Sequence, residues 1–384
     1  MKKNVFVKET KFKGIEKNPS LLGFGCMRFP TQSKDQPEID EKQALKMIDY
    51  AYQHGVNYFD TAYPYHHGLS ETFIGQALKK YPRDTFYLAT KMPTWLIVSL
   101  DDARRIFYEQ LEKCQVDYFD FYLCHALNRS NYKTYQIPGV MDFLYQMKKE
   151  GKIRHLGFSF HDTPEILNEI IHAFKWDFVQ LQLNYLDWEF QDAKTQYKIV
   201  KEYGVPCIVM EPVRGGLLAS LSDKSKAYLL DKNPDVSIAS WAIRYAASKP
   251  NVLVVLSGMS NEEQTKDNIR TMSDFKPVKQ DEQTVIDRAL KVFLESNAVP
   301  CTGCSYCMPC PEGVDIPELL RIYNRYMITK SKMDFKREYE RLEECKRANL
   351  CVSCGECMSL CPQKINIPKL MQDISNLYQE ISNS

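Results

Sequence analysis

The sequence predicts an α/β fold in which a (β/α)8 TIM barrel is followed by a small α-helical domain. Short apolar runs alternate with segments of helical period over the first 290 residues. About eight such units in about 250 residues fit a closed parallel barrel. Eight of the 13 cysteines lie in two short runs near the C-terminus. We therefore expect a barrel at residues 1–290 and a cysteine-rich domain at residues 291–384.

The expected strands are short runs rich in β-branched, aromatic and other apolar residues. They are Leu22–Phe29, Val56–Asp60, Phe86–Lys91, Tyr118–His125, Ile153–Ser159, Phe178–Gln182, Val205–Glu211 and Val252–Leu256. Helical patterns lie between them, at Glu41–His54, Ser70–Lys80, Leu100–Lys113, Gly139–Glu150, Pro164–Ala173, Asp192–Tyr203 and Ser237–Ala247. Parallel strands need such crossovers. A doubly wound open sheet is the alternative, but its G-x-G-x-x-G loop is missing and only the fragment Gly23-Phe24-Gly25 is present.

Polar residues end three consecutive expected strands, namely Asp60, Lys91 and His125, and Tyr65 follows in the loop after the first of these strands. The active sites of (β/α)8 barrels lie at the carboxyl ends of the strands. Each residue alone is equally compatible with a structural role, but their positions at successive strand ends favour a catalytic group. A phenol has a pKa of about 10, so Tyr65 needs a nearby cation to release a proton easily. Lys91 can supply that charge, and Asp60 can hold Lys91 in place.

The two cysteine runs have the spacing of iron–sulfur ligands. The second run, CVSCGECMSLCP, matches the pattern C-x2-C-x2-C-x3-C-P, whereas the first, CTGCSYCMPCP, is one residue short before its last cysteine. In two-cluster ferredoxins the fourth cysteine of a run binds the other cluster. We therefore expect two 4Fe–4S clusters, one on Cys301, Cys304, Cys307 and Cys361, and one on Cys351, Cys354, Cys357 and Cys310.

Zinc sites and disulfides are the alternatives for these cysteines. Zinc knuckles use separated pairs of cysteines, often with His, but these cysteines form triplets and no His lies between residues 301 and 384. A disulfide framework needs an oxidising compartment, and nothing in the sequence signals export. An internal repeat supports the clusters, because Cys310–Pro317 echoes Cys361–Pro368. With a helical stretch at about Pro317–Asn349 between the runs, the region resembles α-helical ferredoxin domains.

The bulk composition excludes several classes of partner. Lys+Arg number 50 and Asp+Glu number 49, so the balanced charge predicts no nucleic-acid partner and no membrane-surface partner. No apolar run reaches the roughly 18 residues of a membrane-spanning helix. The N-terminal stretch MKKNVFVKETKFKG lacks the apolar core of a signal peptide. We therefore expect a cytoplasmic protein in a reducing setting.

The strand-end residues and their surrounding motifs resemble the aldo/keto reductase family. FDTAYPY carries the family's Asp-Thr-Ala and Tyr, LATK its Lys and YLCH its His, while GKIRHLGFSF and VLSGMSNEEQTKDNI resemble two later segments. These five motifs occur in order over about residues 5–275. The resemblance implies an NAD(P)-dependent oxidoreductase. In it, Tyr65 is the general acid, Lys91 and Asp60 lower the pKa of Tyr65, and His125 orients a carbonyl substrate.

The same resemblance implies which residues bind the nicotinamide cofactor. By position they are Ser159 and Gln180 at the nicotinamide, Arg214 and Gly216 over the pyrophosphate, and Ser260, Gln264, Asp267 and Asn268 at the adenosine phosphate. A solvated loop residue is an equal alternative for Arg214. Met210 stands where the family usually stacks an aromatic ring, and Gln264 stands where many relatives bind the 2′-phosphate of NADP with an arginine. The choice between NADP and NAD therefore stays open.

The sequence thus favours an iron–sulfur aldo/keto reductase that interconverts a small carbonyl compound and its alcohol. Each cluster moves single electrons, whereas nicotinamide moves a hydride, and we find no flavin motif. We therefore expect the clusters to relay electrons to or from a ferredoxin or flavoprotein partner. Two alternatives stay open: an ordinary carbonyl reductase with structural clusters, and a non-catalytic redox sensor or binding module. The complete set of Asp60, Tyr65, Lys91 and His125 argues against the sensor, which needs no proton donor.

Overall fold

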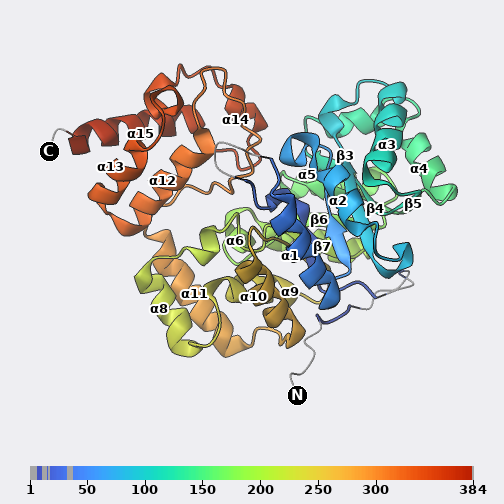
Figure 1. Cartoon of the computed structure of the whole chain (residues 1–384), viewed down its shortest axis with the longest axis horizontal. Helices are drawn as coiled ribbons and strands as arrows, with labels where there is room; N and C mark the ends of the chain where they lie inside the picture. Colours follow the sequence, from blue (N-terminus) through green and yellow to red (C-terminus); the bar gives the residue numbers. More distant parts are fainter. Residues whose placement is uncertain (1–6, 11–14, 16–17, 33–37, 383–384) are drawn as a thin grey trace. The chain divides into compact units, whose positions relative to one another are not determined.

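The computed structural model describes residues 7–10, 15, 18–32 and 38–382 (Figure 1). These residues form two compact units. The first contains the described residues up to Pro212 together with Ser240–Val278, and the second contains Val213–Ala239 and the chain from Lys279 on. The domain boundary expected at residue 290 stays a prediction. Most of the N-terminal stretch that we expect not to be a signal peptide lies outside the described residues.

The first unit is built on a closed barrel of eight parallel strands, which confirms the predicted (β/α)8 fold. Each strand pairs with the next along the chain, and β1 also pairs with β8, so the sheet has no free edge. The strands are β1 (Leu22–Gly25), β2 (Tyr58–Asp60), β3 (Tyr87–Met92), β4 (Phe119–Leu127), β5 (Ile153–Phe160), β6 (Phe178–Gln182), β7 (Cys207–Met210) and β8 (Val252–Gly258).

Only β2 and β6 end at the expected residue, and two of the differences at the other strand ends lie close to the predicted site. The first expected strand runs to Phe29, but β1 stops at Gly25 because Cys26–Arg28 turn into a 3-10 helix, η1. The fourth continues past His125 to Leu127, with a register shift after Cys124. Such irregularities bend a strand and redirect its side chains. Both changes lie at the carboxyl ends of strands, where barrels carry their active sites.

Helices of the first unit follow the expected pattern closely. They are α1 (Glu41–Gln53), α2 (Ser70–Leu78), α3 (Leu100–Cys114), α4 (Val140–Lys149), α5 (Pro164–Ala173), α6 (Asp187–Phe190), α7 (Ala193–Tyr203), α9 (Ile238–Ala247) and α10 (Glu262–Ser273). Several begin at a capping side chain that accepts a backbone N–H, for example Asp40 before α1 and Ser99 before α3. Apolar and aromatic side chains fill the barrel interior, including Tyr58, Phe121 and Phe178.

The second unit is helical and has its own apolar core. Its helices are α8 (Asp223–Lys232), α11 (Gln280–Leu294), α12 (Ile316–Thr329), α13 (Lys332–Glu340), α14 (Glu356–Leu360) and α15 (Ile367–Ser382). Helices α12, α13 and α15 pack on one another and bury Leu319, Phe335 and Ile374 (Figure 1, orange to red). The single long helical stretch expected after Pro317 is divided, because Lys330 adopts a left-handed conformation that ends α12.

The internal repeat of the sequence has a structural counterpart in this core. Val314 and Ile316 lead into α12, and Ile365 and Ile367 occupy the same places before α15. All four side chains are buried in the core of the second unit. The repeat therefore anchors the chain after each cysteine run. Among the described residues, no helix combines the length and the apolarity that crossing a membrane requires.

Candidate active site and cysteine quartets

A buried ion pair joins the carboxyl ends of two neighbouring strands. Asp60 is the last residue of β2, and Lys91 lies near the end of β3. The Nζ of Lys91 donates to Oδ1 of Asp60 at 2.5 Å and to the carbonyl oxygen of Thr61 at 2.7 Å. The two charged side chains are only 1% and 4% exposed. An isolated buried charge is costly, so each partner makes the burial of the other tolerable.

Tyr65 and His125 lie beside this pair. The Nζ of Lys91 is 4.8 Å from the centre of the Tyr65 ring. The rings of Tyr65 and His125 meet edge to face, with their centres 6.1 Å apart. Burial lowers the pKa of His125 well below its usual value, and the charge of Lys91 lowers it further, so the imidazole is neutral. The structure thus brings the four predicted side chains together at one end of the barrel.

The pKa of Tyr65 departs from the expectation. Burial raises this pKa well above its usual value, and the negative charges of Asp60 and Glu211 raise it further. Asp60 therefore does not lower the pKa of Tyr65 as we expected. The physical reason is that burial disfavours the charged phenolate and that the negative carboxylate of Asp60 opposes a second negative charge beside it. In this structure Tyr65 is therefore a protonated phenol.

His66, next to Tyr65, has a positional role. Its Nε2 accepts a hydrogen bond from the backbone N–H of Phe29 at 3.1 Å. Burial lowers the pKa of His66 to about 4, which keeps the ring neutral and able to accept this bond. His66 and His67 both have a positive φ, and they form a tight turn directly after Tyr65. The bond to Phe29 therefore ties the Tyr65 turn to the chain after β1.

A network of buried polar side chains contacts the backbone carbonyl of Lys91. Oε1 of Glu71 accepts from Thr90 and from Gln110, each at 2.6 Å. The same amide nitrogen of Gln110 also donates to the carbonyl oxygen of Lys91 at 2.9 Å, and Tyr122 donates to the amide oxygen of Gln110. Oε2 of Glu71 has no hydrogen-bond partner among the described residues. Burial raises the pKa of Glu71 from 4.5 to about 7.

Replacing Glu71 by glutamine is expected to change the pH dependence of stability. Because the folded-state pKa is raised, the native carboxyl keeps a proton that the unfolded chain releases. Its contribution to the unfolding free energy is therefore present at low pH and lost as pH rises from about 4.5 to about 7, by about 3 kcal/mol in total. The melting temperature of Glu71→Gln, measured relative to that of the wild type, should therefore rise as the pH increases from about 5 to about 8. The exposed Glu263→Gln on α10 is the control, and a parallel gain there would contradict the prediction.

Two of the predicted nicotinamide contacts lie side by side on neighbouring strands. Ser159 on β5 and Gln180 on β6 are register partners. The hydroxyl oxygen of Ser159 accepts from the backbone N–H of Ala126 at 2.8 Å, and the amide nitrogen of Gln180 donates to the sulfur of Met210 at 3.5 Å. Gln180 is buried, and its Oε1 has no hydrogen-bond partner among the described residues. That oxygen suits the carboxamide of a nicotinamide, which is a hydrogen-bond donor.

The predicted pyrophosphate residues lie in the loop after β7. Arg214 is fully buried, and its Nη2 donates to Oε1 of Gln363 at 2.8 Å. A solvated Arg214 is therefore ruled out. Gly216 has φ +94, and a side chain there would meet no other atom within 4 Å. Gly216 thus leaves open space beside the loop, as a phosphate approaching the backbone needs.

The predicted adenosine-phosphate residues lie at the start of α10, after β8. The amide oxygen of Gln264 accepts from the backbone N–H of Ser260 at 2.8 Å, and both residues are exposed. Asp267 accepts from Arg270 at 2.7 Å. Asn268 is buried and donates to the hydroxyl oxygen of Ser257 at 2.9 Å. Ser260 and Gln264 therefore face solvent, whereas Asn268 supports the end of β8.

Sequence reasoning missed two charged residues beside Tyr65. Arg28 ends η1, and Glu211 directly follows β7. A guanidinium nitrogen of Arg28 lies 3.8 Å from a carboxylate oxygen of Glu211, and both charges act on the pKa of Tyr65. Glu211 was the last residue of an expected strand, so the rule that found Asp60 would have found it. Trp95 also lies near, with its ring centre 5.2 Å from that of His125.

The four cysteines expected to bind one cluster, here called the first quartet, are electrostatic neighbours in the structure. Burial raises the pKa of the Cys307 thiol to about 12, and the neighbouring thiolates that raise it further are Cys304, Cys301 and Cys361. Cys361 belongs to the second run, and the other three belong to the first. The two runs therefore meet in space at this quartet.

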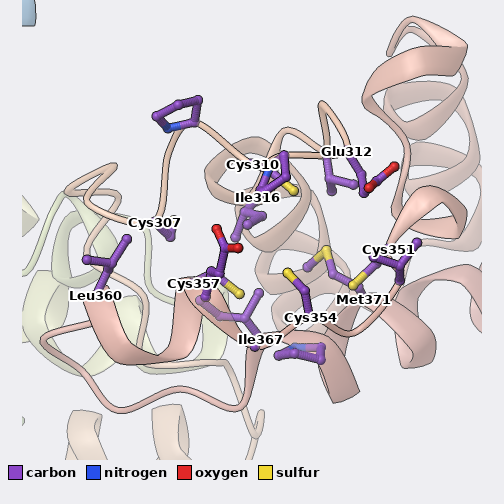
Figure 2. Close-up of a pocket in the computed structure, with 17 residues that line it drawn as sticks. Cys307, Cys310, Glu312, Ile316, Cys351, Cys354, Cys357, Leu360, Ile367 and Met371 are labelled. Carbon is purple, nitrogen blue, oxygen red and sulfur yellow. The ribbon is translucent and has the colours of Figure 1, made fainter.

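The second quartet surrounds a pocket. The pKa of Cys357 is raised by burial and then by the charges of Cys351, Cys354 and Cys310. Figure 2 shows these side chains around the hollow, which Ile316, Ile367 and Met371 also line. Among the described residues, no three His, Cys, Asp or Glu side chains are grouped as ligands of one metal ion. In a 4Fe–4S cube each thiolate binds a different iron, so the ligands stand around a volume.

Comparison with known proteins assigns both parts of the chain. The model of the aldo/keto reductase family matches residues 21–291, and that of a 4Fe-4S dicluster domain matches residues 300–366. The chain belongs to the aldo/keto reductase family. It is an NAD(P)-dependent oxidoreductase with a C-terminal iron–sulfur domain. Both family expectations from the sequence are therefore confirmed.

Several relatives cover the barrel of this aldo/keto reductase. L-galactose dehydrogenase of Arabidopsis thaliana is 27% identical over 69% of this chain and 88% of that protein. NADH-specific methylglyoxal reductase of Escherichia coli is 23% identical over 66% of this chain and 90% of that protein. Among solved structures, aldo-keto reductase AKR11C1 from Bacillus halodurans has a TM-score of 0.61 at 25% identity, over 74% of this chain and 96% of that chain. Each of these matches covers about as much of the chain as the barrel family model.

Proposed function

We propose that this protein reduces a small carbonyl compound to its alcohol, or oxidises the alcohol, and that two 4Fe–4S clusters relay electrons to or from a partner. The observation that carries the catalytic part is the buried Lys91–Asp60 pair beside Tyr65 and His125. The bound nicotinamide supplies a hydride to the carbonyl carbon. The unpartnered Oε1 of Gln180 supports a nicotinamide carboxamide at that position.

The proposed roles follow from the chemistry of each side chain. Tyr65 donates its proton to the carbonyl oxygen as negative charge develops there. His125 is neutral, and its N–H donates to the same oxygen and fixes the direction of the carbonyl. Lys91 offsets the charge of Asp60 and stabilises the phenolate that Tyr65 becomes. In the net reaction, the carbonyl compound, NAD(P)H and a proton give the alcohol and NAD(P)+. Tyr65 regains its proton from water.

The relay of electrons is supported by the exposure of the second quartet. Cys354 is exposed, and its neighbours Val352 and Leu360 are 63% and 54% exposed. A ferredoxin or flavoprotein could therefore approach this cluster closely. Each 4Fe–4S cluster carries one electron, so two reduced clusters hold the two electrons that, with one proton, turn the NAD(P)+ formed in one turnover back into NAD(P)H. An ordinary carbonyl reductase with structural clusters is the second candidate, favoured by the packing of cluster cysteines such as Cys301 and Cys307 against the helical core.

We propose NADP or NAD as the dinucleotide without choosing between them. The position that would carry a phosphate-binding arginine holds Gln264, which is bonded to Ser260. The nearest arginine on α10, Arg270, is paired with Asp267. A direct comparison of NADPH with NADH as cofactors decides this point.

Anaerobically purified protein is expected to contain about eight irons and eight acid-labile sulfides, from two 4Fe–4S clusters. Cys354→Ser should lose about half of this iron, because one ligand of the second quartet is gone. Cys345 is exposed and lies outside both quartets, so Cys345→Ser is the matched control and should keep all of it. Stoichiometric zinc without sulfide would contradict the assignment.

The same preparations distinguish an electron-relay role of the clusters from a purely structural role. The clusters are first reduced by reduced ferredoxin or flavodoxin, and carbonyl reduction is then followed with and without NAD(P)H. A relay predicts that reduced clusters are reoxidised when the carbonyl substrate is added together with NAD(P)+. If clusters stay in one redox state throughout turnover with NAD(P)H, they are structural. If no carbonyl compound is reduced under any condition, the sensor alternative gains support.

A further inference from the structure

The corner Arg214–Gly215, in the loop after β7, is built into the iron–sulfur unit. Both residues have a positive φ, +51 and +62. Arg214 is fully buried and donates to Gln363. A side chain on Gly215 would lie 1.9 Å from the carbonyl oxygen of Thr302, so only glycine allows this approach of the two backbones. The corner is therefore closely packed, with no room for a side chain at Gly215.

The two residues that contact this corner are both close in sequence to cysteines of the first quartet. Thr302 directly follows Cys301, and Gln363 comes two residues after Cys361. Cys301 and Cys361 are on different cysteine runs, and both belong to the first quartet. The corner thus touches both chain segments that a cluster at this quartet would tie together.

The other end of the same short segment is fixed beside the catalytic residues. The carbonyl oxygen of Glu211 accepts from the amide of Asn184 at 3.0 Å, and its carboxylate lies 3.8 Å from Arg28. The charge of Glu211 acts on Tyr65. Only Pro212 and Val213 lie between Glu211 and Arg214, and three successive residue steps span at most roughly 11 Å. The corner is therefore tied to Glu211, directly after β7, by a covalent link of two residues.

We propose that residues 211–215 couple the first quartet to the cofactor site, so that a cluster on this quartet strengthens dinucleotide binding. The coupling rests on the proposed function, because it assumes that the dinucleotide lies under the loop after β7. Without the cluster, residues 301–307 and 361–363 are no longer linked through shared cluster ligation. The contacts of Arg214 with Gln363 and of Gly215 with Thr302 then become looser. The loop then has to be ordered when the dinucleotide binds, which weakens binding.

Gln363 gives the sharpest test, because it belongs to neither the loop nor the cofactor site. Gln363→Ala removes the acceptor of Arg214, whereas Gln363→Glu keeps an acceptor of the same length. With intact clusters, Gln363→Ala is expected to weaken NAD(P)H binding by about 5- to 150-fold in a fluorescence titration, the usual range of such couplings. Gln363→Glu should bind close to the wild type. Gln372→Ala, at an exposed glutamine on α15, is the matched control.

Reciprocity supplies a second readout, because a coupling free energy acts equally in both directions. Saturating NAD(P)H should slow the loss of iron from the first quartet to a chelator, and this protection should vanish in Gln363→Ala. Cys361→Ser should weaken NAD(P)H binding more than Cys354→Ser, because Cys361 belongs to the first quartet. Equal affinities of Gln363→Ala and the wild type, or equal effects of Cys361→Ser and Cys354→Ser, would overturn the proposal.

Hydrogen exchange separates a failure of the coupling from a failure of the proposed function. If the intact protein binds neither NADH nor NADPH, the proposed cofactor is wrong. The link itself is then read from the backbone amides of residues 213–222, which should exchange faster in Cys361→Ser than in Cys354→Ser. Unchanged exchange in both variants would show that the first quartet does not hold the loop.

Discussion

Replacing Tyr65 by phenylalanine is expected to lower the rate of carbonyl reduction by about 10²–10⁴-fold, the usual contribution of general acid catalysis. The change removes one hydroxyl and little volume. The Lys91–Asp60 pair does not hydrogen-bond to the phenol, so the pair should persist. Stopped-flow or steady-state assays with NAD(P)H would measure the rate, and a fluorescence titration would show that dinucleotide affinity is kept.

The pH profile gives this prediction a second check. The pKa of Tyr65 is raised, so the phenol is protonated throughout the neutral range and the wild-type rate should not fall there through its ionisation. A matched variant, Tyr63→Phe, alters a neighbouring tyrosine whose hydroxyl donates to Glu109. Tyr63→Phe should keep most of the activity. If Tyr65→Phe reduced the substrate at the parental rate, the proton would come from another group, and the proposed mechanism would be wrong.

Replacing Lys91 by methionine is expected to cut turnover as strongly and also to destabilise the fold. The ammonium is buried and holds Asp60. Breaking a buried pair from one side leaves the other charge without a partner, which typically costs about 3–5 kcal/mol. Thermal unfolding of the full-length, cluster-loaded protein would therefore show a lower melting temperature alongside the lost activity.

The double variant Lys91→Met with Asp60→Asn separates the two effects. It removes both charges, so no uncompensated carboxylate is left in the barrel and the melting temperature should recover substantially. Turnover should stay low, because the cation that stabilises the Tyr65 phenolate is still missing. If turnover recovered together with stability, Lys91 would act only through the fold. The double variant is thus the control for misfolding in the single one.

The barrel and its strand-end residues could be predicted because both depend on local patterns. Alternating apolar runs and helical segments predict the strands, and Asp60, Lys91 and His125 follow from where three strands end. The cysteine runs were equally readable, because iron–sulfur spacing is a short-range signal. The sequence also located Ser159 and Gln180 on strands that turn out to be adjacent.

Arg214 could not be interpreted in the same way. A phosphate partner and a solvated residue were equal alternatives, and the structure instead buries Arg214 against Gln363, 149 residues further along the chain. No periodicity marks a contact at that separation. The sign of the effect of Asp60 on Tyr65 was likewise unreadable, since it depends on where the Lys91 ammonium is held and on how deeply the phenol is buried. Long-range packing decided both cases.

The exchange of ligands between the two cysteine runs has a consequence for biosynthesis. In the proposed ligand sets neither run completes a four-ligand site alone, since Cys361 joins the first triplet and Cys310 joins the second. A nascent chain that ends before Cys361 offers three thiolates at most for the first site. With these ligand sets, cluster insertion has to wait until the second cysteine run has been synthesised. With this sharing of ligands, a truncation within the second run would forfeit both clusters at once, so the second run acts as a checkpoint on cluster assembly.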